Sequence, residues 1–150
     1  MNTITNSIEE TEKFGIELST KLKGGDIVLL SGNLGAGKTA LVKGVAKGFG
    51  IKNTITSPTF TLMNVYPVSQ KSTTINQLIH IDTYRLKDEQ ELLEIGAEDY
   101  LGKPNTVCLI EWPDKIENLL QKYSTKNFIS IEIKQLENSN EREIICNLPN

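Results

Sequence analysis

Short apolar runs alternate with helical periodicities along the first third of the chain. Residues 7–22 predict an amphipathic helix, because Ser7 and Glu10 have the spacing of a capping box. Its apolar face is expected to hold Ile8, Phe14, Leu18 and Leu22. The apolar run 26–31 fits a strand covered on both faces, and a glycine-rich turn separates it from a second helical pattern over 38–49. Strand, glycine loop and helix in this order predict the opening of an α/β nucleotide-binding fold.

The remaining two thirds of the chain predict further strands and two short helices. Residues 56–66 are expected to be a loop that leads into a strand, followed by a polar surface turn over 68–76. Apolar strands are expected over 77–82 and 107–111, each with an acidic residue at its end. A short helix over 88–95 and a helical piece after Trp112 follow these two strands, and an alternating strand over 128–133 is expected to form a hairpin with 143–146.

Together these elements predict one α/β domain over residues 1–150. We expect a P-loop NTPase-like three-layer sandwich, in which helices cover both faces of a mostly parallel sheet. The C-terminal strands are expected to add an antiparallel edge to this sheet. The order of the strands in the sheet cannot be read from the sequence.

Composition and charge exclude several classes of protein. No apolar run approaches the length of about 20 residues that spans a membrane, and the N-terminus lacks the features of a signal peptide. Cys108 and Cys146 offer neither a disulfide framework nor a zinc-binding spacing, so we expect two core residues and a cytoplasmic protein. The net charge is −3, with only two arginines, Arg85 and Arg142. Strong direct binding of nucleic acid is therefore not expected.

The strongest chemical signal is the segment Gly32–Thr39 (GNLGAGKT), which fits the phosphate-loop pattern without a mismatch. Its glycines let successive backbone N–H groups turn inward toward phosphate oxygens, at the positive end of the helix that follows. Lys38 is expected to neutralise the β- and γ-phosphates, and the hydroxyl of Thr39 to bind Mg²⁺. The residues expected to contact the nucleotide here are Asn33, Leu34, Gly35, Ala36, Gly37, Lys38, Thr39 and Ala40.

Acidic residues end two apolar strands, at Asp82 and Glu111. Carboxyl ends of parallel strands meet at one edge of a sheet, so both side chains are expected to face the phosphates, and at least one to serve Mg²⁺ or its water. The alternative is that each acid only caps a strand in solvent. His80 is interpreted as a structural residue rather than an acid–base catalyst. Arg85 follows the end of the strand at Asp82, and from there it is expected to reach a phosphate or to pair with an acidic side chain.

Four blocks with these residues resemble the TsaE (YjeE) family, the small ATPase of bacterial threonylcarbamoyladenosine formation in tRNA. They are Leu30–Thr39, Ser57–Phe60 (SPTF), His80–Arg85 (HIDTYR) and Ile110–Pro113 (IEWP). The resemblance spans residues 26–115, and the sequence beyond residue 120 carries no distinctive motif.

The resemblance implies a role for several residues. Thr59 resembles the first-switch threonine beside the γ-phosphate, and Asp82 resembles the acid of the second switch. Glu111 resembles the Walker-B-like acid that holds Mg²⁺ through water, and Trp112 the tryptophan that lines the nucleotide site. The family also implies ATP as the nucleotide, TsaD and TsaB as protein partners, and contact with tRNA only through that complex.

The leading hypothesis is a Mg²⁺-dependent ATPase that is slow alone and stimulated by its partners. Lys38, Asp82 and Glu111 are its expected catalytic residues, with either acid orienting the attacking water. Slow hydrolysis alone is expected because the sequence has no arginine-rich lid. Two alternatives are a small-molecule kinase on the same scaffold and a module that binds nucleotide only to dock a partner.

Overall fold

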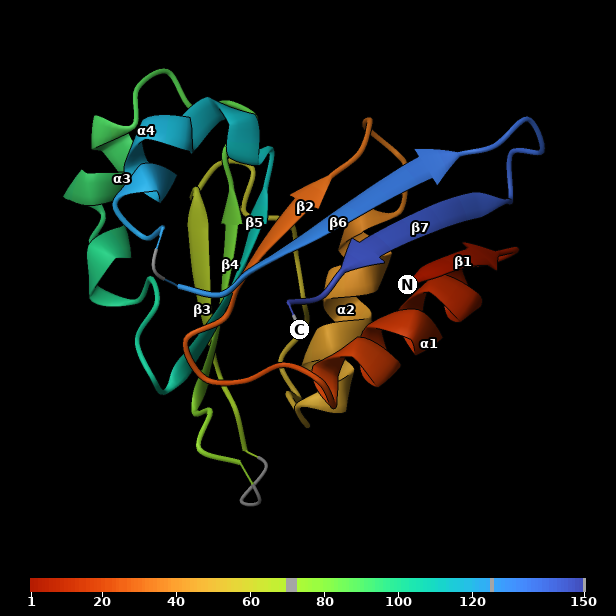
Figure 1. Ribbon diagram of the computed structural model, residues 1–150, viewed down its shortest axis with the longest axis horizontal. Coiled ribbons are helices and arrows are strands. Elements are labelled where there is room, and N and C mark those ends of the chain that lie inside the picture. Colours follow the sequence, from red (N-terminus) through yellow and green to blue (C-terminus); the bar gives the residue numbers. More distant parts are fainter. Residues whose placement is uncertain (70–72, 125, 150) are drawn as a thin grey trace.

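The computed structural model describes residues 1–69, 73–124 and 126–149 of the chain (Figure 1). Its strands are β1 (Asn2–Thr5), β2 (Ile27–Ser31), β3 (Met63–Pro67), β4 (Gln77–Asp82), β5 (Thr106–Glu111), β6 (Phe128–Gln135) and β7 (Arg142–Asn147). Its α-helices are α1 (Ile8–Ser19), α2 (Lys38–Gly48), α3 (Gln90–Glu94) and α4 (Glu117–Gln121). Two 3₁₀ turns, η1 (Ala97–Asp99) and η2 (Pro113–Ile116), complete the described elements.

All seven strands form one sheet in the order β1-β7-β6-β2-β5-β4-β3. The four central strands, β6, β2, β5 and β4, are parallel to one another. The outer strands pair antiparallel on both sides, through β7 and β1 at one edge and β3 at the other. The α/β class and the antiparallel C-terminal hairpin are confirmed. The sheet is mixed: its four central strands are parallel as expected, but β3 adds an antiparallel edge on the other side that the sequence did not predict.

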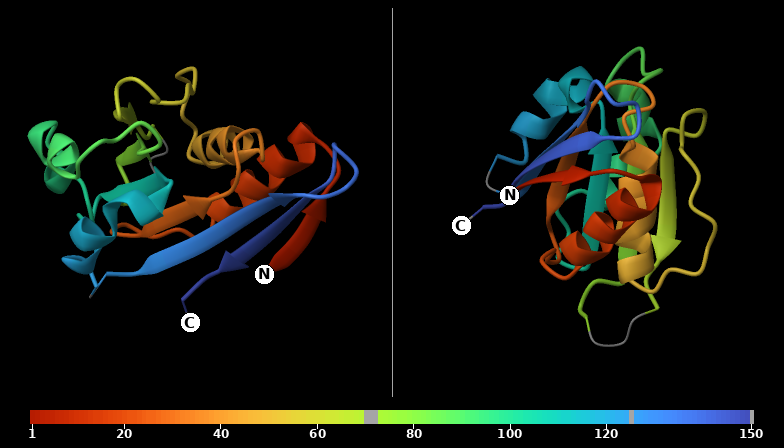
Figure 2. Two further views of the ribbon diagram at one scale, coloured as in Figure 1. Left: turned by 90° about the horizontal axis from the view of Figure 1, so that it is seen from above. Right: turned by 90° about the vertical axis from the view of Figure 1, so that its right-hand side faces the viewer.

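Two hydrophobic cores lie on opposite faces of the central strands. Helices α1 and α2 lie side by side on one face (Figure 2), where Leu18 and Leu41 pack with Val28 and Leu30 of β2. On the other face Ile27 packs with residues from α3, α4, η1 and η2. Successive side chains of a strand point to opposite faces, which is why the unbroken apolar run of β2 serves both cores.

The first helix begins where its capping signal predicts. Ser7 is the N-cap, and its hydroxyl accepts a hydrogen bond of 3.1 Å from the backbone N–H of Glu10. The helix ends at Ser19, earlier than the predicted residue 22. The placement of Ile8 on the packed face is wrong, because its side chain is 67% exposed. Ile8 is the first residue of the helix, and there it turns away from the core that Phe14 and Leu18 enter.

The edge strands β1 and β3 are short and carry polar residues. The sequence predicted the strand that follows the loop in residues 56–66, which is β3, but it did not predict β1. Strand β1 pairs with β7, and β3 pairs with β4. Only one residue in each, Thr5 and Tyr66, is buried. The predicted polar turn over 68–76 includes residues 70–72, which lie outside the described residues.

The connections of the sheet bring three strand ends to one place. Strand β2 ends at the glycine loop, its neighbour β5 ends at Glu111, and β4, on the far side of β5, ends at Asp82. These two acids are direct partners in the register of β4 and β5. No helix among the described residues is long and apolar enough to cross a membrane.

Candidate functional site

The glycine loop joins β2 to α2 and takes a conformation that depends on its glycines. Gly35 and Gly37 have φ angles of 77° and 108°, in the left-handed region that favours glycine. Gly37 is also the N-cap of α2, so the first turn of that helix opens directly onto the loop. Backbone N–H groups at a helix start carry partial positive charge and attract anions. The loop therefore has the chemistry of an anion site.

Lys38 is buried at the base of this loop. Its ammonium donates hydrogen bonds to the carbonyl oxygens of Gly32 and Asn33. Its Nζ also lies 4.1 Å from the centre of the Trp112 ring, as in a cation–π contact. Burial lowers the pKa of Lys38 from its ordinary value, while the charges of Glu111 and Asp82 act in the opposite direction. The lysine is thus a desolvated cation that faces two acids.

A cleft of 750 Å³ lies over the loop and has two different ends. At one end, which we call the acid end, β4 and β5 contribute their terminal acids. It is lined by Ser57, Thr59, Asp82, Tyr84, Arg85, Glu111 and Trp112. At the other end, which we call the α1 end, the start of α1 meets the β6–β7 turn. It is lined by Ser7, Ile8, Thr11, Glu12, Asn140 and Arg142.

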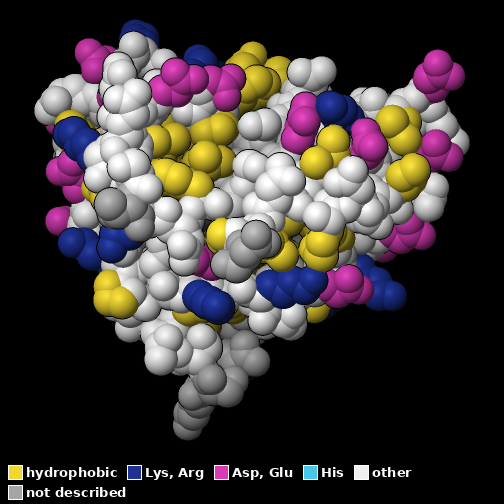
Figure 3. Space-filling model, in the orientation of Figure 1, with side chains coloured by type: hydrophobic (Ala, Val, Ile, Leu, Met, Phe, Trp, Pro, Cys, Tyr) yellow, Lys and Arg dark blue, Asp and Glu magenta, His cyan; other side chains and the backbone are white. Residues whose placement is uncertain are grey.

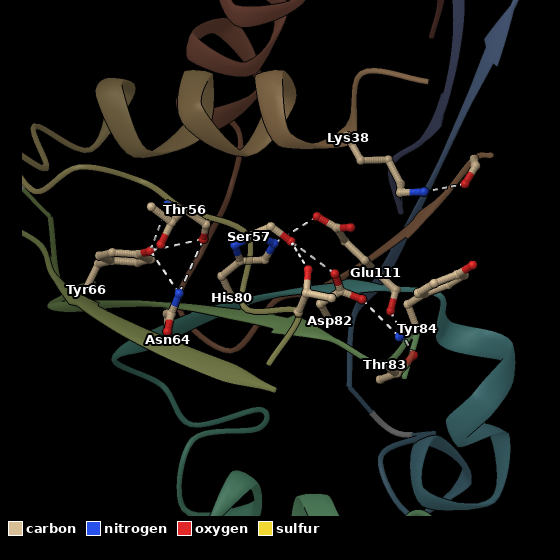
Figure 4. A network of polar contacts seen from close by, with 12 residues as sticks. Lys38, Thr56, Ser57, Asn64, Tyr66, His80, Asp82, Thr83, Tyr84 and Glu111 are labelled. Atoms are coloured by element: carbon tan, nitrogen blue, oxygen red, sulfur yellow. Dashed lines mark hydrogen bonds and ion pairs between the residues drawn. The ribbon is translucent and has the colours of Figure 1, made fainter. Parts of the chain in front are cut away.

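Asp82 ties the loop after α2 to the acid end (Figure 4). Its Oδ2 accepts a hydrogen bond of 3.1 Å from the hydroxyl of Ser57, and its Oδ1 accepts one of 2.9 Å from the backbone N–H of Tyr84. The hydroxyls of Ser57 and Thr59 lie 2.9 Å apart. Both oxygens of Asp82 are therefore engaged, and Thr59 is connected to this acid through Ser57.

Glu111 is held differently from Asp82. Its carboxylate is buried, and Oε1 lies 2.9 Å from Nε2 of His80 on the neighbouring strand. Within residues 1–69, 73–124 and 126–149, His80 is the only side-chain hydrogen-bond partner of this carboxylate. Oε2 has no side-chain hydrogen-bond partner among the described residues, and Glu111 lines the cleft.

Trp112 follows Glu111 in a strained backbone conformation, with φ of 58°. The buried hydroxyl of Thr83 lies within hydrogen-bond distance of the Glu111 carbonyl at 2.9 Å and the Trp112 carbonyl at 2.5 Å. The indole ring lies 5.1 Å from the Tyr84 ring, between centroids. These contacts hold the indole over Lys38 at the acid end of the cleft.

Arg142 holds the glycine loop from the opposite side. Its Nε donates to the carbonyl of Ala36 at 2.9 Å, and its Nη2 to that of Gly35 at 3.4 Å. Its Nη1 also donates to carbonyls of the β6–β7 turn, at Ser139 and Glu141. One guanidinium thus joins the loop to a turn about a hundred residues later in the chain.

Comparison with known proteins identifies the family to which this chain belongs. The model of the family "Threonylcarbamoyl adenosine biosynthesis protein TsaE" matches residues 5–144. The chain belongs to the TsaE family. It is 38% identical over 144 residues to the "tRNA threonylcarbamoyladenosine biosynthesis protein TsaE" of Treponema pallidum, covering 96% of this chain and 98% of that protein. It is 41% identical over 135 residues to the protein of the same name from Rickettsia conorii, covering 89% and 71%.

A solved structure is similar over the whole chain. The "Crystal structure of Bacillus subtilus YdiB" superposes with a TM-score of 0.75 at 30% sequence identity, covering 100% of this chain and 86% of that one. The resemblance to the TsaE family inferred from the four sequence blocks is therefore confirmed.

Most of the site residues expected for a TsaE family member lie on one cleft. Leu34 through Ala40, Thr59, Asp82, Glu111 and Trp112 all line it. Asn33 does not, because it lies beside Ser31 and Gly32 on the other side of the loop and lines a separate shallow hollow. Its side chain is therefore not placed among the cleft residues.

Sequence reasoning missed the role of Arg142. The two arginines are far apart in the sequence, but both line the same cleft. The only signal was the turn at residues 138–140, which places Arg142 at the start of the last strand. The ladder from β2 through β6 to β7 then brings this start toward the loop.

Proposed function

We propose that this protein is a Mg²⁺-dependent ATP-binding and ATP-hydrolysing component of the machinery that forms threonylcarbamoyladenosine (t6A) in tRNA. The observation that carries the proposal is the meeting of Lys38, Asp82 and Glu111 over one glycine loop at the start of a helix. We further propose a P-loop NTPase-like three-layer arrangement for the fold. The name of the family, threonylcarbamoyl adenosine biosynthesis, supports the assignment to t6A formation.

The triphosphate would lie along the loop. The N–H groups of residues 34–40 would bind phosphate oxygens, and Lys38 would leave its backbone acceptors to neutralise the β- and γ-phosphates. The γ-phosphate would then face the acid end. Thr59 lies there, linked through Ser57 to Asp82. Phosphoryl transfer to water depends on positioning and charge neutralisation, and this end of the cleft can supply both.

The donor set of the cleft fits Mg²⁺. Thr39 and Glu111 offer a hydroxyl and a carboxylate oxygen, the hard ligands that this ion prefers. No group of three or more His, Cys, Asp or Glu residues in the described chain forms a complete metal cage. Such a site suits an ion that also uses phosphate oxygens and water. When bound, Mg²⁺ would neutralise charge that develops on the phosphates.

The two acids would divide the remaining work. Glu111 has one oxygen held by His80 and the other directed to no described side chain, which suits the metal or its water. Asp82 has both oxygens engaged by Ser57 and Tyr84, which suits the positioning of the switch loop around the attacking water.

We expect slow hydrolysis by the isolated protein. Arg85 stacks on the exposed ring of Phe60 at 4.6 Å, and Arg142 binds backbone carbonyls of the loop. Neither guanidinium is paired with Asp82 or Glu111 in the described structure. Without an arginine on the transferring phosphate, hydrolysis can be slower by ~10³–10⁵. TsaB and TsaD are the proposed partners that complete the site.

Binding to tRNA is proposed to be indirect, and the cytoplasm is the proposed location. The net charge is −3, and the face in Figure 3 shows Lys and Arg interspersed with Asp and Glu. A protein that binds nucleic acid strongly by itself needs a basic surface.

The test is steady-state phosphate release from ATP and Mg²⁺, with and without purified TsaB and TsaD. We expect slow release alone, strong stimulation by the partners, and loss of both in Lys38→Ala. Fast turnover that ignores the partners would contradict the proposal. Transfer of phosphate to a nucleoside or small alcohol instead of water would favour a kinase. Full t6A formation by Glu111→Gln without hydrolysis would favour a docking module.

A further inference from the structure

We infer that His80 is a positioning residue for Glu111, an inference that rests on the proposed role of that acid. His80 is fully buried, yet its only hydrogen bond among the described residues goes to Glu111 Oε1 at 2.9 Å. It reaches this oxygen from the middle of β4, two residues before Asp82 and on the same face of the sheet (Figure 4).

The geometry fixes the proton of the imidazole. An ionised carboxylate only accepts hydrogen bonds, so Nε2 of His80 must be the donor to Glu111. Nδ1 is buried and has no hydrogen-bond partner among the described residues. In the tautomer with the proton on Nε2, this unpaired atom is an acceptor rather than a donor. The structure therefore assigns the Nε2–H tautomer to His80.

An unpaired buried nitrogen argues against a purely packing role. A buried polar atom without a partner lowers stability, and an apolar side chain at position 80 would avoid that loss. On this face Leu78 and Leu109 are apolar and fully buried, and the amide nitrogen of Asn64, the register partner on β3, donates to Thr56 and Tyr66 rather than to His80. Leu at position 80 would therefore leave no group of the described residues without its partner except Glu111. The polar group contributed by His80 is directed at one acceptor, the Glu111 carboxylate.

The position of Glu111 explains why such a donor matters. Asp82 is its register partner on the adjacent strand, so two carboxylates face one cleft. Asp82 is fixed by two hydrogen bonds, whereas Glu111 has a longer side chain and one partner. The His80 N–H holds Oε1 and leaves Oε2 turned to the cleft. Hydrogen bonds behind a metal-binding carboxylate orient it in this way, and their loss costs about 10- to 100-fold in activity or metal affinity.

The kinetic test compares His80→Leu, which removes the donor, with His80→Gln, whose amide nitrogen can occupy the place of Nε2. With TsaB and TsaD present, we expect His80→Leu to lower kcat for ATP hydrolysis by about 10- to 100-fold and to raise the Mg²⁺ concentration for half-maximal rate. The Kd for ATP is expected to change less than about threefold, and His80→Gln to recover most of kcat. In a Glu111→Ala background, where the acceptor is gone, His80→Leu should cause no further loss.

The matched control is Thr106→Val at the far end of β5. It also removes a buried polar group from the strand that carries Glu111, where Thr106 donates to backbone carbonyls. It should lower stability without changing kcat. The inference is overturned if His80→Leu acts like Thr106→Val, if its loss of kcat persists in the Glu111→Ala background, or if the loss is in Kd alone.

A second measurement decides the contact without relying on hydrolysis. His80 is the only histidine, so its ring ¹⁵N signals in NMR are unambiguous. We expect the Nε2–H tautomer with a slowly exchanging proton in the wild type, and loss of that proton signal in Glu111→Ala. The Nδ1–H tautomer would overturn the inference. If the wild type hydrolyses no more ATP than Lys38→Ala, the proposed function fails, and the NMR result still decides the contact.

Discussion

The two ends of the cleft are built in different ways. At the acid end, Asp82 and Glu111 are buried, with the buried His80 and Thr83 behind them, while Ser57, Tyr84 and Arg85 are exposed. Their contacts run between side chains, or from a side chain to the backbone of a neighbouring strand. At the α1 end, Ile8 is 67% exposed and the nearby loop residue Leu34 is 65% exposed. That end of the loop is held by Arg142 through backbone carbonyls.

This difference indicates a division of work. Buried carboxylates that are held by hydrogen bonds, as Asp82 and Glu111 are, keep their geometry during a reaction, which suits the positioning of water and metal. An exposed end whose contacts are to the loop backbone suits entry, binding and release of a nucleotide. Changes at the acid end should therefore reduce kcat, and changes at the α1 end should reduce affinity.

The largest effect is expected from Asp82→Asn. The change keeps the shape of the side chain but removes the charge that Ser57 and the Tyr84 N–H now bind. We expect kcat for ATP hydrolysis to fall by ~10²–10³, the range for losing a preorganised group that positions the reactants. The affinity for ATP should not fall, so the Kd should stay the same or decrease. Single-turnover hydrolysis and equilibrium binding measure kcat and Kd. A higher Kd with a normal kcat would contradict the assignment of the acid end to the reaction step.

Arg142→Ala should give the opposite pattern. Removing the guanidinium frees the carbonyls of Gly35 and Ala36, so the loop loses part of the order that directs its N–H groups inward. We expect Kd to rise about tenfold for both ATP and ADP, which corresponds to ~1.4 kcal/mol, with kcat little changed.

The control for Arg142→Ala is Lys122→Ala, which removes an exposed cation paired only with Glu98 at 3.7 Å. It should leave both constants unchanged. A fall in kcat without a change in Kd for Arg142→Ala would show that the α1 end also takes part in the reaction.

Ser57→Ala should produce a smaller change at the acid end. It removes the hydroxyl that joins Thr59 to Asp82 but leaves both of those residues in place. We expect kcat to fall about fivefold to tenfold, which corresponds to the ~1 kcal/mol that one hydrogen bond typically contributes. The matched control is Thr61→Ala. It removes another hydroxyl of the same loop, one that is hydrogen-bonded to Asn64 of β3. Equal rates for the two variants would show that the link from Ser57 to Thr59 and Asp82 has no role in hydrolysis.

The smallest effect concerns the buried strand behind the acid end. Burial raises the pKa of Cys108 on β5 from 9.0 to about 12. Between these values the unfolded thiol loses its proton and the folded one keeps it, so the free energy of unfolding falls as pH rises above 9.0. The slope should be ~1.4 kcal/mol per pH unit relative to Cys108→Ala. Urea unfolding of both proteins at pH 8 and pH 10, under reducing conditions, measures it, and parallel curves would contradict a buried Cys108.

The sequence predicted the acid end better than the α1 end, for a physical reason. The glycine loop, Asp82 and Glu111 each carry a local signal, and parallel strand ends bring such residues to one edge of the sheet. Arg142 carries no such signal, because its contact with the loop depends on how the last hairpin pairs with β6. Ile8 was misplaced because helical periodicity cannot tell a packed face from a cleft at the first residue of a helix.

The sheet shows the same limit. Strands β2, β4 and β5 have continuous apolar runs and were predicted within a residue or two. The edge strands β1 and β3 have mixed sequences, and their place depends on pairing with β7 and β4. Edge strands can therefore lie antiparallel without any change in their own pattern.

The central claim is that the Gly32–Thr39 loop binds the triphosphate of ATP through Lys38 and its backbone. Trp112 is the only tryptophan and lies over Lys38, so its fluorescence can report nucleotide binding directly. Titration of the isolated protein with ATP and Mg²⁺ should give a saturable change in the wild type and none in Lys38→Ala. Isothermal calorimetry should give the same Kd. Absence of binding in the wild type by both methods, or equal binding by Lys38→Ala, would contradict the account.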